Sequence, residues 1–138
     1  MAHAHRRAAL RELLRAADLD ATLVTDLVNV RYLTGFTGSN AAVVVHASDS
    51  ESHEARTRLV TDGRYTTQSA EQVPELPRII ERACGAAGVT AAVADGVRRL
   101  GFESAQVTVD GHAALLDVAQ GCELVRAPDL VQSLRVVK

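Results

Sequence analysis

Residues 35–46 read GFTGSNAAVVVH, and this stretch decides the class of fold. Its two glycines allow positive φ and close approach of the backbone in a turn. The residues from Ala41 to His46 that follow form the strongest strand pattern in the chain. A phosphate-binding loop gathers its N–H groups at the start of a helix. Because this turn leads into a strand instead, the pattern predicts a structural turn rather than a nucleotide site.

Helix and strand patterns alternate on both sides of this stretch. Before it, apolar residues recur at helical spacing from His3 to Ala17, a short strand pattern covers 21–25, and Asp26 can cap a brief helix. After it, the patterns predict strands at 58–61, 78–82, 107–109 and 123–126, with Phe102 also strand-like, and helices at 66–72, 112–119 and from Pro128 to about Leu134. The order predicts an α/β domain whose mixed β-sheet is flanked by helices.

Glycines punctuate the less regular parts of the chain. Gly85 and Gly88 predict a turn. A helix with Thr90 as its N-cap is expected to reach Leu100, with an interruption at Gly96, and to end at Gly101. The polar residues 47–56 are expected to form an exposed hairpin tip.

Composition places the chain among single globular domains. It has 138 residues, of which 47% are hydrophobic and 23% charged, and a formal net charge of −2. This balance gives no electrostatic reason to expect nucleic acid. No apolar run is long enough to span a bilayer, and the N-terminus lacks a signal-peptide core, so we expect a cytoplasmic protein without a membrane partner. Cys84 and Cys122 lie too far apart for a zinc or redox pair and are expected to be reduced thiols.

The polar residues do not assemble a recognisable active site. Asp26, Asp62 and Asp110 follow strand or turn patterns, where carboxylates of a metal-dependent nuclease would gather, but each also fits a helix cap or a turn. His3 and His5 form a pair that lacks two further zinc ligands. Residue patterns alone therefore predict no catalytic residue and no metal site.

Two strings of residues carry a resemblance. Tyr32–Ala41, YLTGFTGSNA, and Leu59–Tyr65, LVTDGRY, closely resemble two signatures of the N-terminal domain of the creatinase/prolidase family, which includes Xaa-Pro aminopeptidases and Xaa-Pro dipeptidases. The strings occur in the family's order and spacing, and the resemblance extends over nearly all of residues 1–138. It implies one domain of creatinase/prolidase N-terminal type, with an RNase H-like architecture.

The resemblance also implies that the chemistry belongs to another domain. In this family a C-terminal catalytic domain of the pita-bread fold carries two divalent metal ions, of the Mn, Co or Zn type, and none of that domain is present here. The resemblance thus implies a non-catalytic N-terminal part of a metallopeptidase, a hydrolase that acts on peptides with proline at the second position. Its expected partners are its own catalytic domain and further copies in a homodimer or higher homo-oligomer. Because residues 135–138 form no polar tail after the closing helix, we expect a longer protein.

By position in the family strings, Tyr32, Phe36, Arg64 and Tyr65 are candidates for the substrate entrance. Arg64 can offer a planar fork to a substrate carboxylate, and its other interpretation is an ion pair that holds the turn. Tyr32 and Phe36 can alternatively fill the core around the turn.

The sequence also allows two other interpretations of the chain. The chain can be a free-standing α/β binding or interaction module, which a gene that stops at Lys138 would favour. It can also be the N-terminal half of a creatinase-like amidinohydrolase. A reading frame that continues for about 200 further residues, the size of another domain, would argue against the free-standing module.

Overall fold

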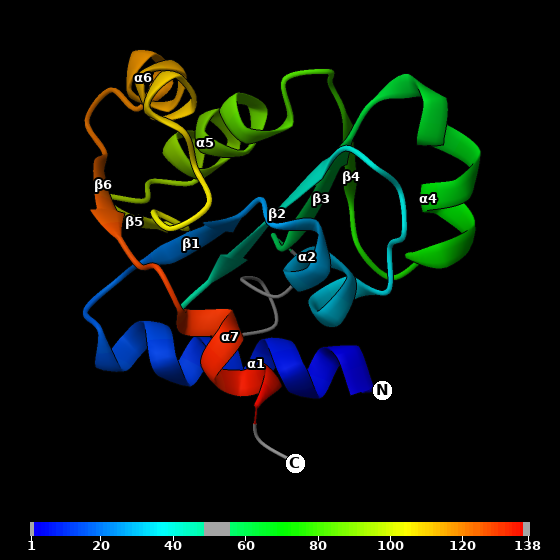
Figure 1. Ribbon diagram of the computed structural model, residues 1–138, viewed down its shortest axis with the longest axis horizontal. Helices are drawn as coiled ribbons and strands as arrows, with labels where there is room; N and C mark the ends of the chain where they lie inside the picture. Colours follow the sequence, from blue (N-terminus) through cyan, green and yellow to red (C-terminus); the bar gives the residue numbers. More distant parts are fainter. Residues whose placement is uncertain (1, 49–55, 137–138) are drawn as a thin grey trace.

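A six-stranded sheet forms the centre of the computed structural model, which describes residues 2–48 and 56–136 (Figure 1). Its strands are β1 (Ala21–Val24), β2 (Ala41–His46), β3 (Arg58–Thr61), β4 (Arg78–Ile80), β5 (Arg99–Phe102) and β6 (Glu123–Arg126). They lie in the order β4-β3-β2-β1-β5-β6, and β2 runs antiparallel to both of its neighbours while the other pairs are parallel. The expected mixed sheet is confirmed.

The continuous apolar run of β2 is explained by helices on both faces of the sheet. All six residues of β2 are buried. Successive side chains of a strand point to opposite faces, so Val43 and Val45 join the core on one face while Ala42 and Val44 join the core on the other. A strand covered on both sides needs no polar positions, which is why this pattern is so strong in the sequence.

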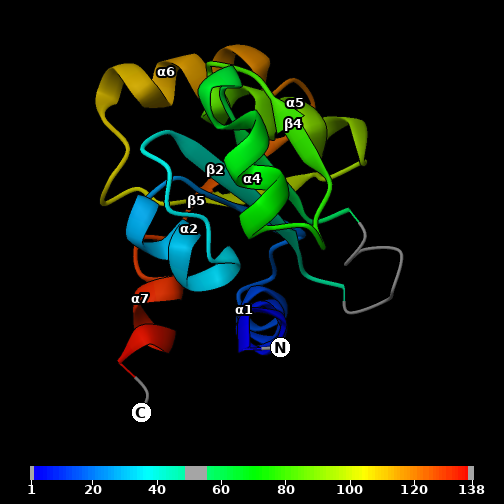
Figure 2. The same cartoon turned by 90° about the vertical axis from the view of Figure 1, so that its right-hand side faces the viewer.

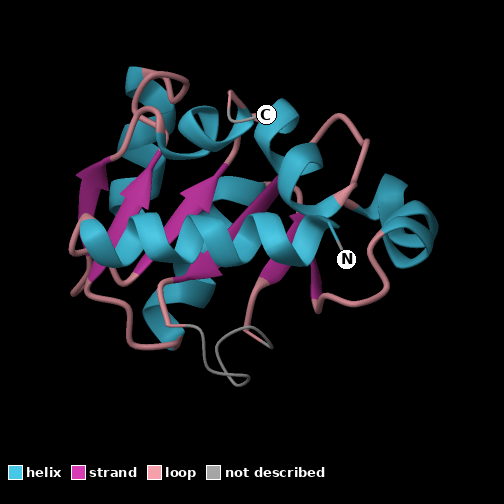
Figure 3. Ribbon diagram, turned by 90° about the horizontal axis from the view of Figure 1, so that it is seen from below, coloured by secondary structure: helices cyan, strands magenta, loops and turns pink. Residues whose placement is uncertain are grey.

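The helices divide between the two faces. One face is covered by α1 (Ala2–Ala16), α2 (Leu27–Thr34) and α7 (Leu130–Arg135), and Figure 3 shows α1 running across the strands. The other face carries α5 (Cys84–Ala94) and α6 (Val109–Val118). The remaining helix, α4 (Thr66–Gln72), follows a 3-10 turn, η1 (Gly63–Tyr65), and faces the viewer in Figure 2.

The predicted turn at Gly85 and Gly88 is wrong, because both glycines lie inside α5. A Cβ atom added to Gly88 would lie 2.6 Å from Leu23 Cδ1 and 3.3 Å from Val44 Cγ2. The glycine therefore lets the helix backbone approach the sheet closely, which is a packing role and not a turn signal.

The helix predicted from Thr90 to Leu100 is only partly correct, because α5 begins earlier, at Cys84, and the chain resumes as strand β5, not as a helix, after the interruption predicted at Gly96. Helix α5 ends at Ala94, because Gly96 adopts a left-handed φ of 85° and residues 99–102 pair with β1 as strand β5. Thr90 is not a cap but an interior helix residue, whose hydroxyl donates to the Ala86 carbonyl oxygen at 3.0 Å.

The strand expected at 107–109 is replaced by the start of a helix. Thr108 has extended backbone and its Oγ1 accepts from the Gly111 N–H at 2.9 Å, so it is the N-cap of α6. The helix consequently begins at Val109 rather than at His112.

Other local predictions are confirmed. Helix α4 and strand β6 have the predicted bounds, and Asp26 caps α2 by accepting from the Val28 N–H at 3.0 Å. The β2–β3 hairpin forms, although most of its tip, residues 49–55, lies outside the described residues.

Both cysteines are free thiols. Within residues 2–48 and 56–136, no helix is long and apolar enough to cross a membrane.

The close approach at Gly88 yields a test of the α5 packing. The Gly88→Val substitution is expected to lower the free energy of unfolding by about 1–3 kcal/mol, because the added carbons have no space against Leu23 and Val44. Ala94→Val at the exposed end of the same helix is the matched control and should change stability by no more than about 0.5 kcal/mol. Urea unfolding measures both, and equal losses would contradict the close approach.

Candidate functional site

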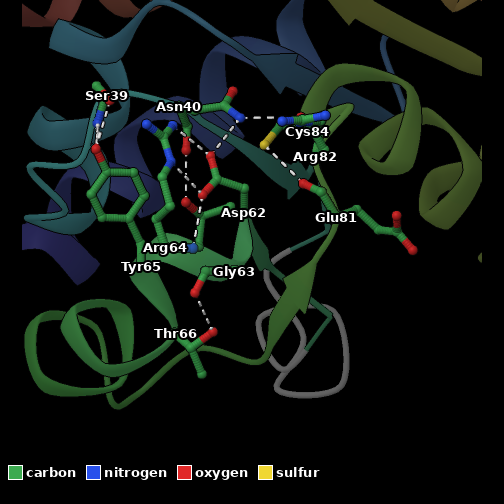
Figure 4. Close-up of polar contacts among 11 residues, drawn as sticks. Ser39, Asn40, Asp62, Gly63, Arg64, Tyr65, Thr66, Glu81, Arg82 and Cys84 are labelled. Carbon is green, nitrogen blue, oxygen red and sulfur yellow. Dashed lines mark hydrogen bonds and ion pairs between the residues drawn. The ribbon is translucent and has the colours of Figure 1, made fainter.

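The carboxylate of Asp62 is the centre of a polar cluster where β3 ends (Figure 4). Its Oδ1 accepts from the Arg64 backbone N–H and from Arg64 Nε, both at 3.0 Å. Its Oδ2 accepts from Arg64 Nη2 at 2.8 Å and from Asn40 Nδ2 at 2.9 Å. The bond from the Arg64 backbone N–H makes Asp62 the N-cap of η1. The aspartate therefore both starts the turn and holds the side chain of Arg64 in place.

Asn40 connects this turn to two other segments. Its Nδ2 also donates to the Arg82 carbonyl oxygen at 3.1 Å, just beyond β4. The backbone carbonyl oxygen of Asn40 accepts from Thr61 Oγ1 at 2.7 Å. One asparagine therefore joins the start of β2, the end of β3 and the segment after β4, as Figure 4 shows.

The charges of the cluster stabilise one another. Hydrogen bonds from the Arg64 side chain, and then from Asn40, hold the pKa of the Asp62 carboxyl well below its usual range. The same pair raises the pKa of Arg64. Both groups are therefore fully charged at neutral pH.

The aromatic residues beside the turn pack against each other. Phe36 and Tyr65 meet edge to face, with ring centroids 5.6 Å apart. The Tyr65 hydroxyl lies 2.6 Å from Ser39 Oγ and accepts from the Ser39 N–H at 3.1 Å, and these bonds lower the pKa of Tyr65. The Phe36 ring is 1% exposed, so it fills the core beneath the turn and presents no surface to a ligand here.

An open hollow of about 600 Å³ lies beside the Asp62 turn. Its lining residues come from the turn before β2, the turn after β3 and the end of β4, namely Asn40, Asp62, Gly63, Arg64, Ile80, Glu81 and Arg82. The Arg64 side chain is 67% exposed although Asp62 holds one edge of its guanidinium. Such a site can bind a carboxylate or a peptide carbonyl through guanidinium N–H groups.

The four residues that the sequence suggested for the substrate entrance do not all lie at one site. Arg64 and Tyr65 adjoin each other, with the Arg64 guanidinium carbon 5.2 Å from the centroid of the tyrosine ring. Tyr32 instead faces α1 and α7, because Arg6 stacks on its ring at 4.3 Å and its hydroxyl donates to the Leu134 carbonyl oxygen at 3.3 Å. The ion pair between Arg64 and Asp62 is present, and a substrate contact of Arg64 stays a prediction.

Sequence reasoning missed most residues of this hollow, Asn40 and Arg82 among them. Asn40 stands inside the quoted string directly before the strand pattern, which could have marked it as a residue of the strand end. Arg82 has no local signal, since only the parallel pairing of Thr61 with Ile80 brings the end of β4 beside the turn.

The Cys84 thiol near the turn is protonated, and no metal cluster lies among the described side chains. Burial, and then the Asp62 carboxylate, raise the pKa of Cys84 to about 11, so its sulfur is a neutral thiol at pH 7. Its S–H donates to the Glu81 carbonyl oxygen at 3.3 Å. Across residues 2–48 and 56–136, no group of three His, Cys, Asp or Glu side chains could hold a metal ion. The two divalent metals implied by the resemblance are expected in the C-terminal catalytic domain and not among these residues.

The sequence matches the creatinase/prolidase N-terminal domain over residues 6–137, and the chain belongs to this family. It is similar to the crystal structure of the N-terminal domain of the cytoplasmic peptidase PepQ from Mycobacterium tuberculosis H37Rv, with 48% identity and a TM-score of 0.89. That match covers 95% of this chain and 98% of the other.

Two similar proteins are much longer than this chain. The uncharacterized peptidase YqhT of Bacillus subtilis is 35% identical over 131 residues, which are 94% of this chain and 35% of YqhT. An Xaa-Pro dipeptidase from Bacillus anthracis is 25% identical with a TM-score of 0.84, and the match covers 99% of this chain and 36% of the dipeptidase. The chain therefore spans about a third of the length of these relatives.

The lowered pKa of Asp62 yields a pH test. The ion pair stabilises the fold above the ordinary carboxyl pKa of 3.8, and this stabilisation is lost as the pH falls below that value. Asp62→Asn should therefore be less stable than the parent at pH 7, and the difference should shrink as the pH falls toward 2.

Thermal unfolding across that pH range measures the effect. Asp117→Asn is the matched control, because Asp117 is exposed and makes no ion pair within the described part of the chain. A stability difference for Asp62→Asn that does not depend on pH would contradict the charged pair.

Proposed function

We propose that this chain is the N-terminal, non-catalytic domain of an Xaa-Pro metallopeptidase and that the Asp62 turn forms part of its substrate entrance. The observation that carries the proposal is the exposed guanidinium of Arg64, held in one orientation by Asp62 at the edge of an open hollow. The family of the domain supports the class of enzyme.

The geometry favours recognition of a carboxylate or carbonyl group of a peptide. Asp62 occupies Nε and Nη2 of Arg64, so Nη1 remains for a ligand. Arg82 lines the same hollow and is an exposed residue, so it adds a second guanidinium. Because the ion pair already orients Arg64, little side-chain entropy is lost when it binds. Tyr65 stands beside Arg64 and limits the space on that side.

The partners follow from the lengths of the relatives. YqhT and the Bacillus anthracis dipeptidase extend far beyond the matched region, which supports a following catalytic domain as the first partner of this chain. Two divalent ions of the Mn, Co or Zn type are expected in that domain, where metals activate water and polarise the scissile carbonyl. Oligomerisation through the N-terminal domain and a cytoplasmic location belong to the same proposal.

The division of labour can be tested with the chain alone. The purified 138-residue chain, supplied with Mn²⁺, Co²⁺ or Zn²⁺, is expected to show no hydrolysis of an Xaa-Pro dipeptide, because its described residues offer no metal cluster. Sequencing the gene beyond codon 138 should show a continuing frame with two Asp, one His and two Glu residues in order. A stop codon there, or cleavage by the chain alone, would contradict the proposal.

Arg64 can be tested in the full-length enzyme. Arg64→Ala should lower kcat/KM for Xaa-Pro substrates about tenfold, mainly through KM, because one charge-assisted hydrogen bond is worth about 1.5–3 kcal/mol. Arg82→Ala should have a smaller effect of the same kind. Arg98→Ala, at an exposed position outside the hollow, is the control. Unchanged kcat/KM in a stably folded Arg64→Ala enzyme would leave Arg64 as a structural residue only.

A further inference from the structure

A second hollow, of about 460 Å³, lies between α1, α2 and the C-terminal end of α7. We name it the arginine hollow, because three arginines and one histidine line it. Its lining residues are His3, Arg6, Val28, Arg31, Tyr32, Gly35, Thr37 and Arg135. No carboxylate is among them, so the fixed charge of the lining is strongly positive at neutral pH.

Two of the arginines are held in place by the fold. Arg6 donates from Nη1 to the Tyr32 carbonyl oxygen at 3.0 Å, and its guanidinium stacks on the Tyr32 ring. Arg135 donates from Nη1 to Asn29 Oδ1 at 2.9 Å. Asn29 is in turn fixed by Glu103, whose Oε2 accepts from Asn29 Nδ2 at 2.6 Å. Each guanidinium keeps further N–H groups that these contacts do not use.

The third arginine has its whole guanidinium available. Arg31 is exposed in the last turn of α2 and makes no side-chain hydrogen bond or ion pair within the part of the chain that the structure describes. Cations are favourable at the C-terminal ends of helices, where Arg31 and Arg135 both lie. That effect explains why each residue is tolerated, but it does not explain why both converge with Arg6 on one hollow.

The N-terminal end of α1 adds to the positive electrostatic potential of the arginine hollow. The first turn of α1 contains no acidic residue, and the partial positive charge of a helix N-terminus is located there. The His3 ring packs close to Gly35, since a Cβ atom on that glycine would lie 2.9 Å from His3 Cε1. Burial, then Arg6 and Arg7, lower the pKa of His3, while Glu75 acts weakly in the opposite direction.

We propose that the arginine hollow binds a phosphate-class anion, either inorganic phosphate or the phosphate monoester of a larger molecule. Three guanidinium groups on separate helices can each donate to a different oxygen of a tetrahedral anion, whereas a single carboxylate offers only two oxygens. Tyr32, Val28 and Thr37 form part of the remaining wall, which gives a monoester an apolar surface to contact.

Isothermal titration at low ionic strength, with inorganic phosphate and separately with AMP as probes, tests this proposal on the 138-residue chain. Saturable binding of one anion per chain is expected. The double variant Arg31→Gln/Arg135→Gln should weaken binding at least about tenfold, the change expected when a charge-assisted hydrogen bond of about 1.5 kcal/mol is lost. Arg31→Lys, which keeps the charge, should restore part of the affinity relative to Arg31→Gln.

Arg98→Gln is the matched control, because it removes one exposed arginine charge outside the hollow. Unchanged affinity in this control supports a defined site, and tighter binding of AMP than of phosphate identifies the monoester as the better ligand. Equal weakening in Arg98→Gln and in the double variant would show only general charge screening and overturn the proposal. Absence of saturable phosphate and AMP binding by a folded parent chain would overturn it as well.

Discussion

The site depends on one carboxylate that is satisfied from four directions. Asp62 accepts three N–H bonds from Arg64 and one from Asn40, so the aspartate closes its own turn and reaches across to the start of the neighbouring strand. A carboxylate with this many donors keeps its charge, because each donor stabilises the ionised form. The orientation of Arg64 and the position of Tyr65 follow from this turn, whereas the parallel pairing of β3 with β4 brings Arg82 beside it.

The arginines of this domain differ in their surroundings. Arg64 has a carboxylate on one edge of its guanidinium, which fixes its direction and reduces its net charge toward a ligand. Arg31 has no such carboxylate within the described residues and lines the arginine hollow together with Arg6 and Arg135. The ligands that we propose differ accordingly: a carboxylate or carbonyl group of a peptide at Arg64, and a multiply charged anion at the arginine hollow.

The fold is suited to a supporting domain. Helices cover both faces of the sheet, and two apolar cores form without a metal or a disulfide among the described residues. The polar clusters instead lie at the ends of strands and helices, where loops carry side chains that can change without loss of the core. The chain belongs to the creatinase/prolidase N-terminal family, and this architecture is compatible with the role that we propose for it beside a separate catalytic domain.

The sequence by itself determined the features that depend on neighbouring residues. The alternation of apolar runs predicted the mixed α/β sheet, and the DGRY string predicted a turn with an arginine at its edge. Local patterns predicted an interruption at Gly96 but not that the chain continues as strand β5, because that strand depends on pairing with β1. Tertiary structure alone decided that Arg82 lines the same hollow as Arg64 and that Arg6 stacks on Tyr32. Both placements depend on strand pairing and helix packing between residues distant in the chain, and no local pattern carries that information.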